Sequence, residues 1–171
     1  IVFGATGFTG RLVAAYLATA APDLRWAIAG RRADELARIA AALPDGARPA
    51  CVTADARDGA SLAAMAARTA VVVSTAGPFA ELGPGVVAAC VAAGTHYADL
   101  TGEVTFVRAM IDAHHDAARA AGVRIVPCCG FDSIPSDLGT QLVLETARAR
   151  GVTLTGVTAL YGAMRGGDNL L

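Results

Sequence analysis

Glycines near the start of the chain have a spacing that is suited to holding a phosphate. Three of them stand at every third position from residue 4 to residue 10, between a short apolar run and a helical pattern. In such a turn, glycine permits a tight bend and lets a pyrophosphate approach backbone N–H groups at the start of a helix. An ordinary glycine-rich turn is the alternative interpretation. We favour a dinucleotide site and expect six residues to form it: Gly4, Thr6, Gly7, Phe8, Thr9 and Gly10.

The residues that follow the second apolar run indicate which dinucleotide binds. Sites that prefer NAD place an acidic residue about 20 residues after the glycines, where it binds the ribose 2′-OH. Here that position is Gly30, and Arg31 and Arg32 come next. Guanidinium groups attract the 2′-phosphate of NADP and can bind it through paired hydrogen bonds. Two arginines at a helix start are otherwise unfavourable because of the helix dipole, so we expect NADP(H) rather than NAD(H).

Two further segments extend the predicted cofactor site. Asp55 follows the third strand-like run and could border the adenine, although it could equally cap the helix that comes next. Ala76, Gly77 and Pro78 follow the fourth run, and such small residues would let the inner ribose and the nicotinamide lie against the backbone. A tight turn that ends at Pro78 is the alternative for this segment.

Titratable residues gather after the fifth strand-like run. We expect Tyr97 and Asp99 to be the candidates for a proton donor or a substrate contact, with a buried structural tyrosine as the alternative. Thr101 and Glu103 are interpreted instead as the cap and the first-turn acid of the helix that follows. The candidates for substrate contact are Phe79, Phe131 and Asp132, which follow other runs of the same predicted sheet.

Metal binding is not expected. His114 and His115 are adjacent on a predicted helix and point about 100° apart, so they cannot chelate one ion together. The four cysteines are spaced for neither a zinc site nor a secreted disulfide framework, and we expect all of them to be reduced.

These residues need a scaffold that brings the ends of several strands together. Short β-branched runs alternate with longer alanine-rich helical runs along the chain. The sequence predicts strands at 1–3, 25–29, 50–53, 71–74, 96–100 and 124–127, and helices at 11–19, 33–43, 61–68, 86–93, 104–121 and 136–150. Such alternation predicts an α/β fold, a doubly wound parallel Rossmann sheet with helices on both faces. We expect an NADP-binding domain at 1–150 and, from 151 to 171, the start of an incomplete second α+β domain with a strand at 152–161.

The composition excludes several classes of protein. Apolar residues make up 54% of the 171 residues, so the chain is not disordered as a whole. All basic residues are arginines, which excludes a Schiff-base lysine, a Walker P-loop and the Tyr-x-x-x-Lys pair of short-chain dehydrogenases. A net charge of −1 without a basic cluster gives no basis for nucleic-acid binding. No apolar stretch is long enough for a transmembrane segment. Because we expect the cysteines to be reduced, we expect a cytoplasmic protein and leave peripheral association with the membrane open.

Taken together, the motifs resemble those of the saccharopine dehydrogenase-like family, most of all its bacterial branch of trans-acting enoyl reductases. Many nucleotide-binding proteins share the glycine turn, whereas Gly-Thr-His-Tyr-Ala-Asp-Leu-Thr-Gly-Glu at 94–103 and Cys-Cys-Gly-Phe-Asp-Ser-Ile-Pro-Ser-Asp at 128–137 are more specific. The resemblance implies an NADP-binding Rossmann domain followed by a larger α+β domain that holds much of the substrate site. It carries over no catalytic residue.

The same resemblance implies an NADP-dependent oxidoreductase that reduces an enoyl or related lipid-linked substrate, with a homodimer through the second domain left open. Two alternatives also stay open: an amino-acid-pathway imine dehydrogenase of the saccharopine type, and an NADP-binding sensor or assembly protein without catalysis. An imine substrate with several carboxylates would call for arginines in its pocket, and the stretches 71–106 and 125–140 contain none.

Overall fold

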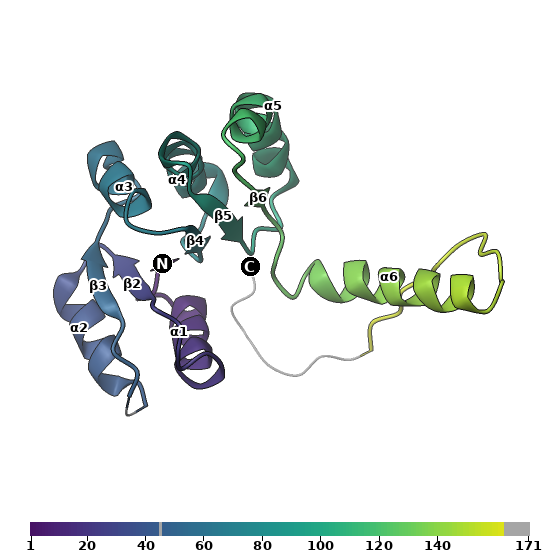
Figure 1. Cartoon of the computed structure of the whole chain (residues 1–171), viewed down its shortest axis with the longest axis horizontal. Coiled ribbons are helices and arrows are strands. Elements are labelled where there is room, and N and C mark those ends of the chain that lie inside the picture. The colour runs from purple at the N-terminus through teal and green to yellow at the C-terminus, as the bar shows by residue number, and fades with distance from the viewer. Residues whose placement is uncertain (45, 163–171) are drawn as a thin grey trace. The chain divides into compact units, whose positions relative to one another are not determined.

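A parallel sheet forms the centre of the fold. The computed structural model describes residues 1–44 and 46–162, and in this part the sheet has six strands in the order β3-β2-β1-β4-β5-β6 (Figure 1). The strands are β1 (Val2–Phe3), β2 (Ala27–Gly30), β3 (Ala50–Thr53), β4 (Val71–Ser74), β5 (His96–Asp99) and β6 (Ile125–Val126). The helices are α1 (Phe8–Ala20), α2 (Ala33–Ala42), α3 (Gly59–Ala66), α4 (Phe79–Ala93), α5 (Val104–Ala120) and α6 (Ile134–Ala149).

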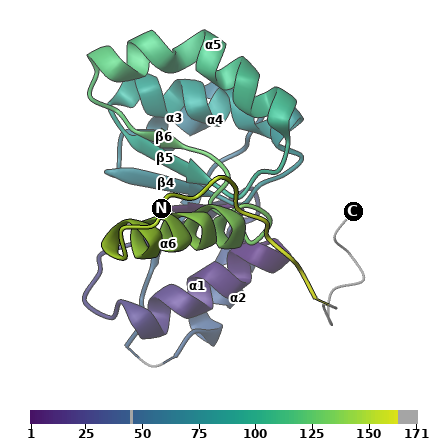
Figure 2. The ribbon, with the colours of Figure 1, turned by 90° about the vertical axis from the view of Figure 1, so that its right-hand side faces the viewer.

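The order of the strands reverses between β1 and β4. Strands β1 to β3 run outward in one direction, and the chain then crosses back to place β4 to β6 on the other side of β1. Helices α1 and α2 cover one face of the sheet, while α3, α4 and α5 cover the other (Figure 2). The predicted doubly wound parallel sheet with helices on both faces is confirmed. In such a sheet, ligands bind beyond the carboxyl ends of the strands at the point of reversal.

Each face of the sheet packs on its own hydrophobic cluster, because alternate strand residues point to opposite faces. Val2 and Ile28 pack toward α1 and α2, together with Ala5, Ala14 and Leu36. Phe3 and Ala29, one residue further along, pack with the cluster beneath the other helices. That second cluster also contains Val72, Leu62, Met65, Phe79, Val86, Val87, Cys90, Tyr97 and Phe106.

The helix after β4 begins earlier than the sequence predicts. We expected it to start at Val86, after Gly83, Pro84 and Gly85, but α4 starts at Phe79 and contains Pro84. Proline in a helix interior removes a backbone hydrogen bond. A carboxylate from another segment binds the N–H groups of the first turn of α4, as described below, and supports this turn against that loss.

The chain divides into two compact units, Ile1–Gly130 and Phe131–Leu171. In the second unit, α6 is followed by an irregular segment, and the hydroxyls of Ser136 and Tyr161 are hydrogen-bonded. The strand expected at 152–161 is not formed, since no described segment pairs with these residues. Residues 163–171, with the predicted end of the second domain, lie outside the described residues. The expected domain boundary after residue 150 stays a prediction.

Candidate functional site

The first turn of the fold requires glycine at Gly4. Its φ of +84° lies in the left-handed region, and a Cβ built there would stand 2.9 Å from both the backbone nitrogen of Ala76 and Oγ1 of Thr75. The contact arises because β1 and β4 are neighbours in the sheet. Gly4 therefore lets the turn after β1 pass closely over the turn after β4.

Gly7 and Gly10 differ in what surrounds them. A Cβ at Gly10 would stand 2.3 Å from the carbonyl oxygen of Gly4, so this glycine allows α1 to sit against the turn. A Cβ at Gly7 would meet only that oxygen, at 3.3 Å, and its other sides are open. Gly7 is the N-cap of α1, with no side-chain cap and no acidic residue in the first turn. The first N–H groups of α1 are therefore available to an anion.

A pocket of about 320 Å³ opens over the turns that follow β1 and β4, and we call it the glycine-turn pocket. It lies beyond the carboxyl ends of four strands, β1 to β4, at the reversal of the strand order. Seven residues predicted to bind the cofactor line it: Gly4, Thr6, Gly7, Arg31, Asp55, Ala76 and Gly77. The structure thus brings together Gly4 and Gly77, which lie 73 positions apart in the sequence, in the place where the fold predicts a ligand.

The other predicted cofactor residues do not line this pocket. Phe8 and Thr9 stand at the start of α1. The side chain of Phe8 is 82% exposed and that of Thr9 is half-buried, and neither lines the pocket, so any part they play is through their backbone N–H groups. Gly10 is buried beneath the turn, and Pro78 is the N-cap of α4. Sequence patterns identified the turn, but not which atoms of each residue face the pocket.

Arg31 and Arg32 point to different environments. Arg31 lines the pocket, whereas Arg32 is the N-cap of α2 and forms an ion pair with Glu35 within that helix. The structure therefore separates the two arginines that the sequence placed together. A third arginine, Arg57, lines the pocket instead, from the loop after β3. Sequence reasoning missed Arg57 because it lies 26 positions beyond Arg31 and joins it at the same pocket only once β2 and β3 have paired.

Asp55 lines the same pocket and also shapes the loop after β3. Its Oδ1 accepts a hydrogen bond from the backbone nitrogen of Arg57 at 3.0 Å. The cap of α3 is Asp58, whose carboxylate accepts hydrogen bonds from the nitrogens of Ala60 and Ser61. Asp55 is therefore not the helix cap that the sequence left open as an alternative, and its placement agrees with a position near the nucleoside.

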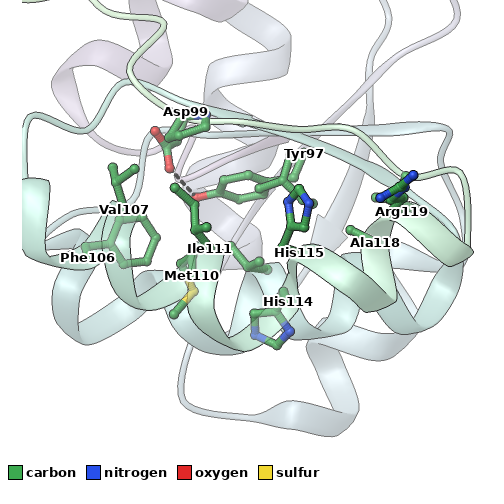
Figure 3. Close-up of a pocket in the computed structure, with 14 residues that line it drawn as sticks. Tyr97, Asp99, Phe106, Val107, Met110, Ile111, His114, His115, Ala118 and Arg119 are labelled. Atoms are coloured by element: carbon green, nitrogen blue, oxygen red, sulfur yellow. Dashed lines mark hydrogen bonds between the residues drawn. The ribbon is translucent and has the colours of Figure 1, made fainter.

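Tyr97 and Asp99 do not line the glycine-turn pocket. Their side chains share the face of β5 that is covered by α4 and α5, and they are only 1% and 2% exposed. The phenol of Tyr97 donates a hydrogen bond to Oδ2 of Asp99 at 2.8 Å (Figure 3). Oδ1 of Asp99 accepts hydrogen bonds from the nitrogens of Thr101 and Cys128, at 3.0 and 3.1 Å. As a correction to the sequence analysis, both side chains lie away from the cofactor edge and have a structural task, while their part in catalysis stays a prediction.

A second cavity, of about 410 Å³, lies between α5 and strands β5 and β6. Tyr97 and Asp99 come from β5, Phe106, Val107, Met110 and Ile111 come from α5, and His114, His115 and Arg119 lie further along the same helix (Figure 3). The walls are mainly apolar, and burial with the nearby Asp99 charge raises the pKa of the Tyr97 phenol above its ordinary value. A phenol held neutral in this way acts as a hydrogen-bond donor at ordinary pH.

Glu103 binds the start of a helix other than its own. Its two carboxylate oxygens accept hydrogen bonds from the backbone nitrogens of Phe79 and Ala80, at 2.7 and 2.8 Å. A carboxylate at a helix N-terminus satisfies free N–H groups and is favoured by the helix dipole. The sequence analysis assigned Glu103 to the first turn of α5, so this is a correction. Thr101, expected as a cap, accepts a hydrogen bond from the nitrogen of Glu103 at 3.0 Å and fixes the segment.

The three predicted substrate residues lie in two different settings. Phe79 is buried and packs on Phe106, with ring centroids 6.1 Å apart, so its side chain belongs to the core. Phe131 and Asp132 belong to the second unit, and their contact with a substrate stays a prediction. In the described residues, no group of His, Cys, Asp and Glu side chains is arranged to hold a metal ion, and no helix is long and apolar enough to cross a membrane.

A comparison with known protein families agrees with a dinucleotide site at the glycine-turn pocket. Residues 1–126 match the family described as saccharopine dehydrogenase NADP binding domain. The chain belongs to this family. The predicted resemblance to saccharopine dehydrogenase-like proteins is thereby confirmed.

Relatives of this NADP binding domain include proteins of mycobacteria. Trans-acting enoyl reductases of Mycobacterium leprae and Mycobacterium tuberculosis are each 48% identical to the chain, over 96% of its length and 44% of theirs. The chain thus spans less than half of the length of these relatives. The similarity to trans-acting enoyl reductases expected from the sequence is therefore confirmed.

Solved structures share the fold of the domain. Apo saccharopine dehydrogenase (L-Glu forming) from Saccharomyces cerevisiae superposes with a TM-score of 0.71 at 19% identity, covering 88% of this chain and 31% of that chain. An NAD binding oxidoreductase from Klebsiella pneumoniae superposes with a TM-score of 0.57 at 26% identity, covering 88% of this chain and 38% of that one. The likeness to the yeast enzyme shows the fold alone.

The residues of this saccharopine dehydrogenase NADP binding domain fit a dinucleotide. The side of Gly7 that faces away from Gly4 is open, and a side chain at this position would project into the space beside the start of α1. The free N–H groups there suit a pyrophosphate, and Arg31 adds a positive charge beyond β2. The start of α1 and the residue after β2 thus meet at one edge of the sheet.

Proposed function

We propose that the chain is the NADP(H)-binding part of an oxidoreductase that reduces an enoyl or related lipid-linked substrate. The observation that carries the proposal is Arg31, which lines the glycine-turn pocket and directly follows Gly30, the position where an NAD site has an acidic residue. The names of the mycobacterial relatives support the reaction, and the family name supports the cofactor.

In this proposal each pocket residue holds a different part of the cofactor. The N–H groups at the start of α1 bind the pyrophosphate beside Gly7, and Arg31 binds the 2′-phosphate with its guanidinium. Asp55 borders the adenosine, and its Oδ1 is already occupied by the nitrogen of Arg57. Ala76 and Gly77 present backbone with little side chain, so that the inner ribose and the nicotinamide can lie close to the turn after β4.

The bound cofactor supplies a hydride, which in enoyl reduction goes to the β-carbon, while the α-carbon takes a proton. The titratable side chains that line the described pocket are Arg31, Asp55 and Arg57, and all of them stand on the adenosine side of the site in this proposal. Tyr97 and Asp99 face the other cavity. We therefore place the proton donor outside the residues that line this pocket, in water or in the part of the protein that the longer relatives have beyond the matched stretch.

The proposal also covers membrane association and the oligomeric state of the protein. A lipid-linked substrate would bring the protein to a membrane surface, and a homodimer would form through residues beyond the matched stretch. Flotation with phospholipid vesicles and the mass of the full-length protein by light scattering test these two points. A protein that stays unbound and monomeric would restrict the proposal to the reaction.

The test of the reaction uses the full-length protein with NADPH. We expect the absorbance of NADPH to fall when a 2-enoyl thioester is added, and a saturated thioester to be the product by mass spectrometry. Oxidation of NADPH with a saccharopine-type imine instead would favour the amino-acid-pathway alternative. Binding of NADPH without turnover of either substrate class would favour the sensor or assembly protein.

A further inference from the structure

The glycine-turn pocket contains a second arginine that no sequence pattern indicates. Gly30 and Thr53 are paired across β2 and β3, so the chain leaves both strands at the same edge of the sheet. Arg31 follows Gly30 directly, and Arg57 stands in the loop after β3. Both residues line the pocket, Arg31 from the segment after β2 and Arg57 from the loop after β3.

Some arginines of the described chain are paired with carboxylates, and the two that line the pocket are not. Arg32, Arg38 and Arg108 each form an ion pair with a carboxylate one turn away. In the described part of the chain, no ion pair is assigned to Arg31 or to Arg57. The loop of Arg57 is held by the side chain of Asp55, whose Oδ1 accepts a hydrogen bond from the backbone nitrogen of Arg57 at 3.0 Å. Its backbone is thus fixed while its guanidinium is available to a ligand.

The charges that line the pocket favour an anion. Two arginines and the carboxylate of Asp55 line it, and Oδ1 of Asp55 already accepts a hydrogen bond from the backbone N–H of Arg57. A phosphate monoester carries a charge of about −1.5 to −2 at pH 7 and offers three acceptor oxygens, enough for two guanidinium groups at once. One arginine alone would leave part of this charge without a partner.

We propose that Arg31 and Arg57 bind the 2′-phosphate of NADP(H) together, from the ends of β2 and β3, and that Arg57 rather than Arg32 is the second specificity-determining residue. This inference rests on the proposed function, since it concerns the same cofactor site. The competing role for Arg57 is stacking of its guanidinium on the adenine, which would act on NADPH and NADH alike.

Isothermal titration of the full-length protein with NADPH, NADH and 2′-AMP distinguishes these roles. Arg57→Ala should weaken the binding of NADPH and 2′-AMP by about tenfold or more, because a hydrogen bond to a charged group is lost, and change NADH binding by less than about twofold. Arg57→Lys should recover part of the loss, since it keeps the charge without the planar fork. Arg32→Ala is the matched control, and it should leave all three affinities unchanged. Thermal melting checks that each variant is folded.

An equal loss of NADPH and NADH affinity in Arg57→Ala would assign Arg57 to the adenine and overturn the inference, and so would no loss at all. The inference and the proposed function fail in different ways. If the unmutated protein prefers NADPH and only Arg31→Ala removes the preference, the proposed cofactor stands and the role of Arg57 falls. If the unmutated protein binds both cofactors equally, both proposals fall.

Discussion

The phenol oxygen of Tyr97 and Oδ2 of Asp99 are 2.8 Å apart, in a hydrogen bond that is closed off from solvent. Because Asp99 also accepts hydrogen bonds from Thr101 and Cys128, one carboxylate joins β5 to the loops that follow β5 and β6. Buried polar groups that are fully bonded fix one arrangement of the backbone around them. The specific sequence block at 94–103 thus has a structural explanation, separate from the cofactor pocket.

Tyr97→Phe should lower the free energy of unfolding by about 1–3 kcal/mol, because Oδ2 of Asp99 loses its donor while the carboxylate stays buried. Affinity for NADPH should change little, since Tyr97 does not line the glycine-turn pocket. Urea unfolding and cofactor titration measure the two effects. Tyr16→Phe is the matched control, because Tyr16 is exposed on α1, and it should change the stability by less than about 0.5 kcal/mol. A loss of turnover in Tyr97→Phe at unchanged stability would contradict a purely structural role and support the predicted catalytic one.

Gly7→Val should abolish NADPH binding and leave the protein folded. The backbone of Gly7, at φ −74° and ψ 169°, is one that valine adopts, and a Cβ there meets only the oxygen of Gly4. The added side chain would instead occupy the space proposed for the pyrophosphate.

Gly10→Ala should act on stability instead, since its Cβ would stand 2.3 Å from the carbonyl oxygen of Gly4 and must displace α1. We expect this variant to lose stability. Circular dichroism, thermal melting and NADPH titration separate the two variants. Full NADPH affinity in folded Gly7→Val would place the phosphate elsewhere.

Glu103→Gln should destabilise the protein by about 1–2 kcal/mol, because the amide group can replace only one of the two hydrogen bonds to the start of α4 and carries no charge. Glu81→Gln is the control, as Glu81 lies in the first turn of the same helix without such contacts assigned. Its effect should be less than half as large. Chemical unfolding of both variants makes the comparison, and equal stabilities would contradict the capping role of Glu103.

Raising the pH above about 9 should destabilise the fold through Cys90. Burial raises the pKa of its thiol from the ordinary value of 9.0 to about 12. Between these values the unfolded chain releases the proton and the folded chain keeps it, so unfolding becomes more favourable by about 1.4 kcal/mol per pH unit. Below about pH 9 both states keep the proton, and the contribution to the pH dependence vanishes.

Cys90→Ala should reduce this slope, whereas Cys51→Ala should not, since Cys51 is exposed. Urea unfolding under reducing conditions, at about pH 8 and about pH 11, measures the effect. Identical slopes for the parent protein and Cys90→Ala would show that the thiol does not contribute.

Local patterns predicted the fold well because strand and helix periods differ clearly in this chain. The strands at Ala50–Thr53 and Val71–Ser74 have the predicted bounds, and the glycine turn lies where its spacing placed it. The start of α4 was missed because its stabilising contact comes from Glu103, 24 residues further along. A prediction from neighbouring residues takes Pro84 into account but not the distant carboxylate of Glu103.

The candidate site was only partly predictable, for a related reason. Which strand end a residue follows can be read from the sequence, and this was enough for Gly4, Arg31 and Asp55. Which face a side chain takes depends on how strands and helices pair, and this separates Arg31 from Arg32 and turns Tyr97 away from the pocket. Arg57 could be recognised as a pocket residue only from the pairing of β2 with β3 in the structure.

The most direct test of the account is the affinity of the full-length protein for NADPH and NADH, measured by isothermal titration with the parent protein and Arg31→Ala. Arg31 lines the pocket at the end of β2, so we expect NADPH to bind at least about tenfold more tightly than NADH. Arg31→Ala should remove most of this preference while NADH binding stays the same. Equal affinity of the parent protein for the two cofactors would contradict the account.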